Sequence, residues 1–235
     1  MRLPWLARSL HKWLALVVGV QLAIWTLSGL YMVVVHIDII HGDHLVRSLP
    51  PARFDLRALS APAELMDPSS DQGARLISLR GAPAYVIDGA SGRRVVDARS
   101  GAPLPPLNEA EIRPIAQRLY TGDGAIETAE LLTKAPGEIK GRAMPIWRVE
   151  FEGLGDPTFY LSPQTGELVS RRHDLWRAFD IAWMLHIMDY KERADVNNPL
   201  LRVVTVAAAF TTLSGAWLLL YSFPKRKRRR ARSTT

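Results

Sequence analysis

The sequence contains no cysteine, which excludes disulfide bonds, thiol nucleophiles, iron–sulfur clusters and zinc sites built on Cys ligands. It also lacks a glycine-rich dinucleotide fingerprint, a phosphate-binding loop, a nucleophile–base pair and a paired-carboxylate motif. Hydrolysis and nicotinamide oxidation are therefore not expected of this chain. Charge is missing from two long stretches, Leu14–Val35 and Val203–Phe223, neither of which contains Asp, Glu, Lys, Arg or His.

These two uncharged stretches are long enough to cross a lipid bilayer. As a helix, Leu14–Val35 spans roughly 33 Å, which exceeds the thickness of the hydrocarbon core. No small-residue cleavage pattern follows Val35, so we interpret the first stretch as an uncleaved anchor and not as a signal peptide. The sequence thus predicts two transmembrane helices with the rest of the chain on one side of the membrane.

The distribution of charge predicts which side that is. Ten of the 30 Lys and Arg residues lie in the two short tails, before the first span and after the second. All 23 acidic residues lie between the spans. Short Lys/Arg-rich segments stay in the cytoplasm, so both termini are expected there and the middle is expected to be exported. The basic run Lys225–Arg230 contains no aromatic residue to stack on bases, and we interpret it as a contact for anionic lipids and not for nucleic acid.

The region between the spans has the pattern of a helix packed on antiparallel strands. Asn108 and Glu111 have the spacing of a capping box, and apolar residues then recur at helical intervals. Alternating residues predict strands over 74–79, 84–87, 93–97, 125–133, 146–152, 158–161 and 167–169. Three copies of the pattern [DS]-x-x-[ST]-G, beginning at residues 88, 97 and 162, predict capped turns without chemistry.

The predicted fold class is an α+β membrane protein, with two transmembrane helices flanking a periplasmic domain of a helix on an antiparallel sheet. The expected parts follow in chain order: 1–13 cytoplasmic tail, 14–36 first span, 37–73 connector, 74–103 β-rich segment, 104–172 main domain, 173–198 amphipathic juxtamembrane helix, 199–223 second span and 224–235 basic tail.

Several segments resemble known families. The helix followed by WRVEFE and TFYLSPQTGELVSRR is similar to a PepSY domain, and LHKWLAL…TLSGLY with MLHIMDY…NNPLL…TLSGAW resembles the PepSY-associated transmembrane family. The resemblance covers about two-thirds of the chain, and 47–102 matches least, either as a degenerate copy of the domain or as an insertion. It implies a location in the bacterial inner membrane and a link to haem-bearing membrane reductases of siderophore uptake.

The candidate cofactor ligands are His11, His36 and His186. The family resemblance points to His11 and His186 as ligands of haem b, but they are expected at opposite faces of the membrane, so one haem cannot use both. His36 could pair with His186, whereas His11 would need a second copy of the chain. In the alternative interpretation His11 lies at the membrane interface and His186 packs on the amphipathic helix, without haem. His41 and His44 are expected to be solvated, and no metal site is predicted.

Both spans contain Thr-Leu-Ser-Gly, at Thr26–Gly29 and Thr212–Gly215. Small residues allow helices to approach closely, but antiparallel spans put the two motifs at different depths, so they are not expected to meet within one chain. Pairing between copies, or with another membrane protein, would explain them.

Two function classes stay open. The first is an accessory to transmembrane electron transfer or iron and siderophore reduction, working with a redox partner protein. The second is a non-catalytic, membrane-tethered module that binds a periplasmic partner or regulates a peptidase.

Overall fold

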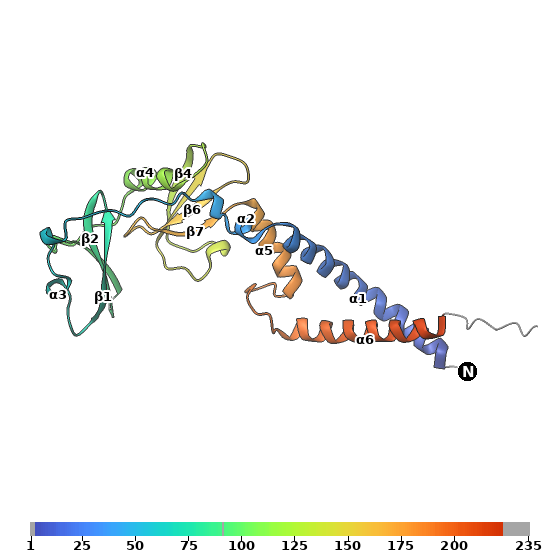
Figure 1. Ribbon diagram of the computed structural model, residues 1–235. Helices are drawn as coiled ribbons and strands as arrows, with labels where there is room; N and C mark the ends of the chain where they lie inside the picture. The colour runs from blue at the N-terminus through green and yellow to red at the C-terminus, as the bar shows by residue number, and fades with distance from the viewer. Residues whose placement is uncertain (1–2, 91, 223–235) are drawn as a thin grey trace, which may run out of the picture. The chain divides into compact units, whose positions relative to one another are not determined.

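The computed structural model describes residues 3–90 and 92–222, which divide into two compact units (Figure 1). The first, called here the helical unit, comprises Met1–Val35 with Phe179–Thr235, and the second, the α+β unit, comprises His36–Ala178. The predicted α+β class with two long apolar helices is confirmed. The basic tail at 224–235, with its predicted lipid contacts, lies outside the described residues.

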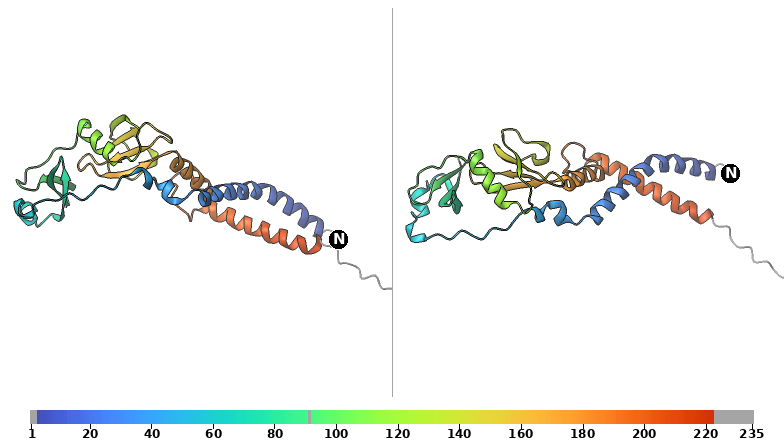
Figure 2. Two further views of the ribbon diagram at one scale, coloured as in Figure 1. Left: turned by 45° about the horizontal axis from the view of Figure 1, so that its top comes forward. Right: turned by 90° about the horizontal axis from the view of Figure 1, so that it is seen from above.

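The helical unit is built on two long helices, α1 (Leu3–Val34) and α6 (Pro199–Ser222), which lie alongside one another (Figure 2). Within them, His11–Val34 and Pro199–Leu219 are long and apolar enough to cross a membrane by length and composition. Helix α1 begins well before the predicted span, because Leu3–Trp13 continues the same helix. Helix α5 (Asp174–Ile187) lies where the juxtamembrane helix was predicted but is shorter than 173–198, and its later turns belong to this unit.

The junction before α6 depends on Asn198. Its side-chain oxygen accepts a hydrogen bond from the backbone N–H of Leu201 at 2.9 Å, which caps the helix. Its side-chain amide donates to the carbonyl oxygen of Ile187 at the end of α5, also at 2.9 Å. The second long helix begins at Pro199 as predicted, but the juxtamembrane helix already ends at Ile187, before the predicted break, and Asn198 fastens the end of α5 to the start of α6.

The α+β unit begins with α2 (Ile37–His41) and the single turn α3 (Pro62–Leu65). A three-stranded antiparallel sheet follows, in the order β1 (Asp71–Leu79), β2 (Ala82–Gly89) and β3 (Gly92–Asp97). The second copy of the turn motif caps itself as predicted, since the Asp97 carboxylate accepts from the backbone N–H groups of Arg99 and Ser100.

The second half of this unit is α4 (Glu109–Leu119) with a four-stranded antiparallel sheet. The strands are, in spatial order, β4 (Ile126–Leu132), β5 (Ile146–Phe151), β6 (Thr158–Leu161) and β7 (Leu168–Arg172). The capping box is present: Asn108 Oδ1 accepts from the Glu111 N–H, and Glu111 Oε2 accepts from the Asn108 N–H.

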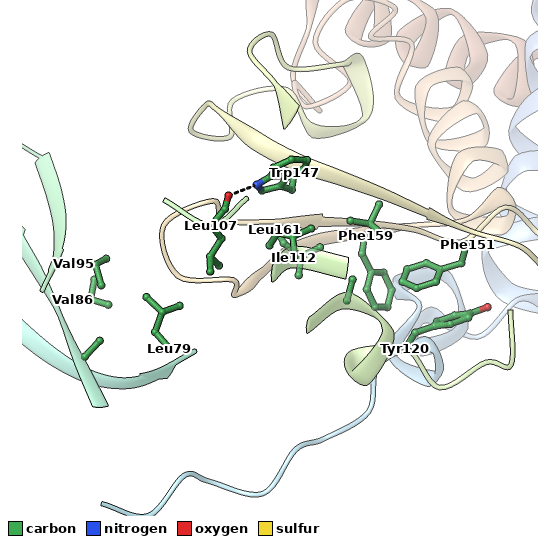
Figure 3. Close-up of a cluster of buried hydrophobic side chains, with 13 residues drawn as sticks. Leu79, Val86, Val95, Leu107, Ile112, Tyr120, Trp147, Phe151, Phe159 and Leu161 are labelled. Carbon is green, nitrogen blue, oxygen red and sulfur yellow. Dashed lines mark hydrogen bonds between the residues drawn. The ribbon is translucent and has the colours of Figure 1, made fainter. Parts of the chain in front are cut away.

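One hydrophobic cluster joins the two sheets. It contains Leu79, Val86 and Val95 from the first sheet together with Ile112 and Ala116 of α4 and the inner face of the second sheet. Figure 3 shows the stack of Tyr120 on Phe151, and the Trp147 indole N–H donating to the Leu107 carbonyl. The segment 47–102 therefore shares a core with the rest of the α+β unit.

The outer face of the second sheet is partly covered. Ile146 and Tyr160 are buried there, and Ile139 covers them together with partly buried Leu132 and Met144. The connection between β4 and β5 thus forms a second, smaller core with the outer face of the sheet, which only long-range packing creates.

Candidate histidine–serine sites in the helical unit

His11 of α1 forms a hydrogen bond across to α6. Its Nδ1 atom lies 2.7 Å from the hydroxyl oxygen of Ser214. That hydroxyl already donates its one proton to the carbonyl oxygen of Thr211, at 2.8 Å. A serine hydroxyl has a single proton, so when that proton is on the Thr211 carbonyl, Nδ1 of His11 is the donor to Ser214 and the neutral imidazole carries its proton on Nδ1. The Nε2 atom is left with a free lone pair.

His186, near the end of α5, is held in the same way by α1. Its Nδ1 atom lies 2.9 Å from the hydroxyl oxygen of Ser28, and that hydroxyl donates to the carbonyl of Ile24 at 2.8 Å. The argument that assigns the proton of His11 therefore applies to His186 as well, and Nε2 is again the unprotonated nitrogen. Within the described residues, no hydrogen bond is made at Nε2 of either histidine.

Two further side chains of α1 hold the end of α5 in place. The indole N–H of Trp25 donates to the backbone carbonyl of His186 at 2.7 Å, and the Gln21 amide reaches the carbonyl of Leu185 at 3.4 Å. Gln21, Trp25 and Ser28 are spaced by four and three residues, so they share one face of α1. These three side chains inside the first apolar run thus form a single stripe directed at α5.

The glycine after each serine leaves room for the imidazole. A Cβ added at Gly215 would lie 3.1 Å from Cε1 of His11, and one added at Gly29 would lie 3.7 Å from Cε1 of His186. Each Thr-Leu-Ser-Gly motif therefore receives a histidine from another segment of the same chain. Sequence reasoning found both histidines and both motifs but did not connect them, because the partners lie 203 and 158 residues apart.

His11 borders an apolar hollow of about 520 Å³ in the helical unit. The remaining lining residues are Leu14 of α1 and, from α6, Val203, Val206, Ala207, Phe210, Ser214, Trp217 and Leu218. At 100° per residue the α6 members fall on one face of the helix. We call this feature the His11 groove.

The third predicted ligand, His36, lies in the α+β unit and has local partners. It is the N-cap of α2, where its Nδ1 accepts from the Asp38 N–H at 3.3 Å and lies 3.4 Å from a carboxylate oxygen of Asp38. The imidazole is exposed, and because Nδ1 accepts, the neutral ring carries its proton on Nε2, so binding a metal through Nε2 would require this cap to be given up. A shared iron between His36 and His186 stays a prediction.

The remaining histidines behave partly as expected. His41 and His44 are exposed, in agreement with the prediction of solvated residues. Sequence reasoning missed His173, which is only 5% exposed and donates from Nε2 to the carbonyl of Ile40 at 3.1 Å. Burial lowers the pKa of His173 below its usual range. Among residues 3–90 and 92–222, no three His, Asp or Glu side chains are grouped as a metal site.

A second hollow, of about 720 Å³, lies within the α+β unit between the β1–β2 turn, α4 and the β6–β7 turn. Arg80 at the β1–β2 turn donates to both carboxylate oxygens of Glu111, at 2.5 and 3.0 Å. Arg75 makes the corresponding pair of bonds to Glu167, and it lowers the pKa of that carboxyl. Arg118 of α4 is exposed at the rim.

Comparison of the chain with models of protein families, with curated proteins and with solved structures finds no match. The function is therefore argued from the sites alone.

Proposed function

We propose that α1 and α6 cross the bacterial inner membrane, with both termini in the cytoplasm and the α+β unit in the periplasm. Large apolar side chains on both helices are exposed, among them Val17 at 74%, Val33 at 83% and Phe210 at 66%. Apolar surface of this extent is costly in water and favourable in lipid. The basic residues near the N-terminus and the C-terminus of the chain support the proposed orientation.

Reporter fusions test this orientation. A cytoplasm-active reporter fused after Thr235 is expected to be active, whereas a periplasm-active reporter is expected to work only when inserted in the α+β unit, for example after Gly141 in the β4–β5 loop. The reverse pattern would overturn both the orientation and the proposal that follows.

Within that membrane arrangement, the function that the geometry supports best is haem-based electron transfer. The observation that carries this proposal is the pair of histidine–serine hydrogen bonds, which hold His11 and His186 through Nδ1 and leave Nε2 of each without a hydrogen bond among the described residues. An unpartnered imidazole nitrogen in apolar surroundings is costly unless it binds something. Metal-binding histidines have this form, with one nitrogen on the metal and the other donating to a neighbouring oxygen.

The donor set fits a haem iron. Neutral imidazole is a good ligand for iron, and His11 itself lines the apolar His11 groove. Bound haem would supply one-electron chemistry through its iron. The chain itself would hold the ligand imidazoles with Ser28 and Ser214, and its apolar side chains would exclude water from the iron.

The two histidines lie at different depths in the proposed bilayer. Ser28, which holds His186, follows His11 by 17 positions in α1, equivalent to about 26 Å along a helix. One chain therefore carries a ligand toward each face of the membrane, as an electron-transfer accessory requires. Electrons would leave at the periplasmic end, near His186, toward periplasmic iron, a siderophore complex or a redox partner protein. This agrees with the resemblance to PepSY-associated membrane proteins.

The visible spectrum of the full chain, purified in mild detergent after expression with added haem, tests this function. A Soret band that shifts on reduction by dithionite, with sharp α and β bands, is expected. His11→Ala and His186→Ala should each remove part of it, and His44→Ala, at an exposed imidazole of the α+β unit, should leave it unchanged. A protein without any Soret band contradicts the proposal.

The hollow of the α+β unit favours a second candidate function, a membrane-tethered module that binds a periplasmic partner. Its volume lies within the range of ligand sites, and apolar side chains share its lining with Arg118 and two ion pairs. Crosslinking of the α+β unit to a neighbour should then persist when His11, His36, His41 and His186 are all replaced by alanine. If the variant without the four histidines loses the crosslink and Arg118→Ala keeps it, the hypothesis of a tethered binding module is contradicted.

A further inference from the structure

The helical unit has one histidine at each depth, whereas a haem with two histidine ligands needs two. His11 and His186 are the two histidines of this unit, and the other four, at 36, 41, 44 and 173, lie in the α+β unit. Two nitrogen ligands of one iron are about 4 Å apart, whereas the two histidine–serine pairs are separated by about 26 Å along α1. One helical unit thus offers a single imidazole at each depth.

We infer that a second copy of this chain docks on the His11 groove and that its own His11 supplies the missing ligand, so that the haem is shared between the two copies. The inference rests on the proposed function. A second copy inserted in the same orientation has every residue at the same depth as in the first copy. A two-fold axis along the membrane normal can therefore place His11 opposite His11, and His186, the other histidine of the helical unit, lies too far along the membrane normal to supply that ligand.

The shape of the groove suits a second copy. Its α6 residues are spaced by three and four positions, as in the seam of packed helices. Ala207 lies in the middle of this face, where a small side chain allows close approach of a neighbouring helix. Val206 and Phe210 beside it are 55% and 66% exposed, so their apolar surface has no cover within the described part of the chain.

The absence of native cysteine allows the docking face to be mapped with single cysteines. Ala207 lines the groove, whereas Ala209 is exposed, does not line it and points about 160° away on the same helix. In membranes under mild oxidation, Ala207→Cys is expected to form a disulfide-linked dimer and Ala209→Cys is expected to stay monomeric. Crosslinking at Ala209 and not at Ala207 would overturn the docking face.

Mixed dimers test the shared ligand. One wild-type copy and one His11→Ala copy carry different affinity tags, and tandem purification isolates the pairs that contain both. If the haem is shared, the low-spin signal of the His11 site in electron paramagnetic resonance is lost completely, with a high-spin signal in its place. If His11 of each chain instead pairs with a ligand from a different partner, half of the low-spin signal is kept.

The outcomes separate the two proposals. Failure to capture mixed pairs, or retention of half the low-spin signal, would overturn the shared ligand and leave haem binding standing. A wild-type protein with no haem band would instead overturn the proposed function and the shared ligand with it. The haem at His186 serves as the folding control, because its signal in the His11→Ala copy reports an intact helical unit.

Discussion

At Ser28 and Ser214 one hydroxyl group decides which nitrogen of a neighbouring imidazole carries the proton. Each hydroxyl donates within its own helix and can only accept from the histidine, so the histidine presents its Nε2 lone pair. A serine inside an apolar helix usually bonds its own backbone and nothing else. Here the same group has a second role, which the motif sequence alone does not reveal.

Ser214→Ala removes the acceptor for the Nδ1 proton of His11. We expect haem affinity at the His11 site to fall by about 10- to 100-fold, the usual cost of losing a group that orients a metal ligand. Ser214→Thr keeps a hydroxyl and should restore most of the affinity. Titration of haem into the apoprotein measures the effect. Thr212→Ala is the matched control, since among the described residues Thr212 bonds the Ala208 carbonyl of its own helix and no histidine. Equal losses in both variants would contradict the role of Ser214.

His173 is a buried titratable group that fastens helix α2 to the rest of the α+β unit. Its imidazole donates to the Ile40 carbonyl and meets the ring of His44 at 5.7 Å, and Arg177 is a nearby cation that disfavours a second positive charge. Burial lowers the pKa of His173 in the folded state, so the neutral form is the one that the fold holds.

Stability should therefore depend on pH through His173. A folded pKa below the unfolded value means that the contribution is fully present above about pH 6.5 and is lost as the pH falls from there toward the lowered pKa. The free energy of unfolding is expected to drop by about 1.4 kcal/mol for each unit of difference between the two pKa values. Urea unfolding from pH 8 to pH 5 measures this, and His173→Gln should flatten the slope. An unchanged slope in the variant would refute the assignment.

At the scale of elements, helix α4 shows how one carboxylate can serve two contacts. Glu111 completes the capping box with the Asn108 N–H and also binds the Arg80 guanidinium from the β1–β2 turn. These bonds, first to Arg80 and then to the Asn108 backbone, lower the pKa of Glu111. Arg80 is held at a positive φ of 54°, so this contact fixes a turn that a non-glycine residue seldom adopts.

Two substitutions at Glu111 separate these contacts. Glu111→Gln keeps an acceptor for the cap and removes the charge that Arg80 binds, so a loss below about 1 kcal/mol is expected, and it should shrink in high salt. Glu111→Ala removes both contacts and should cost about 1–2 kcal/mol. Urea unfolding of both variants measures the difference. Equal losses for the two variants would show that the cap contributes nothing.

At the scale of the whole molecule, the two units differ in what holds them together. The hydrophobic clusters of the α+β unit draw all their buried members from residues 79–161, so this unit has its own core. The helical unit instead exposes most of its apolar side chains and joins its helices through the two histidine–serine pairs. Water stabilises the first arrangement, whereas the second suits lipid.

The fragment 36–178 is therefore expected to be soluble and to unfold cooperatively in urea without detergent. Its unfolding midpoint should not change with added reductant, because the chain has no disulfide bond to reduce. Circular dichroism and tryptophan fluorescence should report one coincident transition. A fragment that aggregates, or whose two transitions are separate, would show that the α+β unit depends on the helices.

The sequence by itself determined the features that depend on local pattern. Charge-free length predicted the two long helices, alternation predicted the strands, and the spacing of Asn108 and Glu111 predicted the start of α4. Each of these signals lies within a few neighbouring residues, so no knowledge of the fold is needed to read them.

Only the tertiary structure decided which distant groups meet. It placed His11 against Ser214 and His186 against Ser28, covered the outer face of the second sheet with the β4–β5 connection, and buried His173 under Ile40. Such contacts depend on how whole elements pack, and no periodicity along the chain records the partner of a side chain more than a hundred residues away. The candidate ligands were visible in the sequence, but the serines that set their protonation were not.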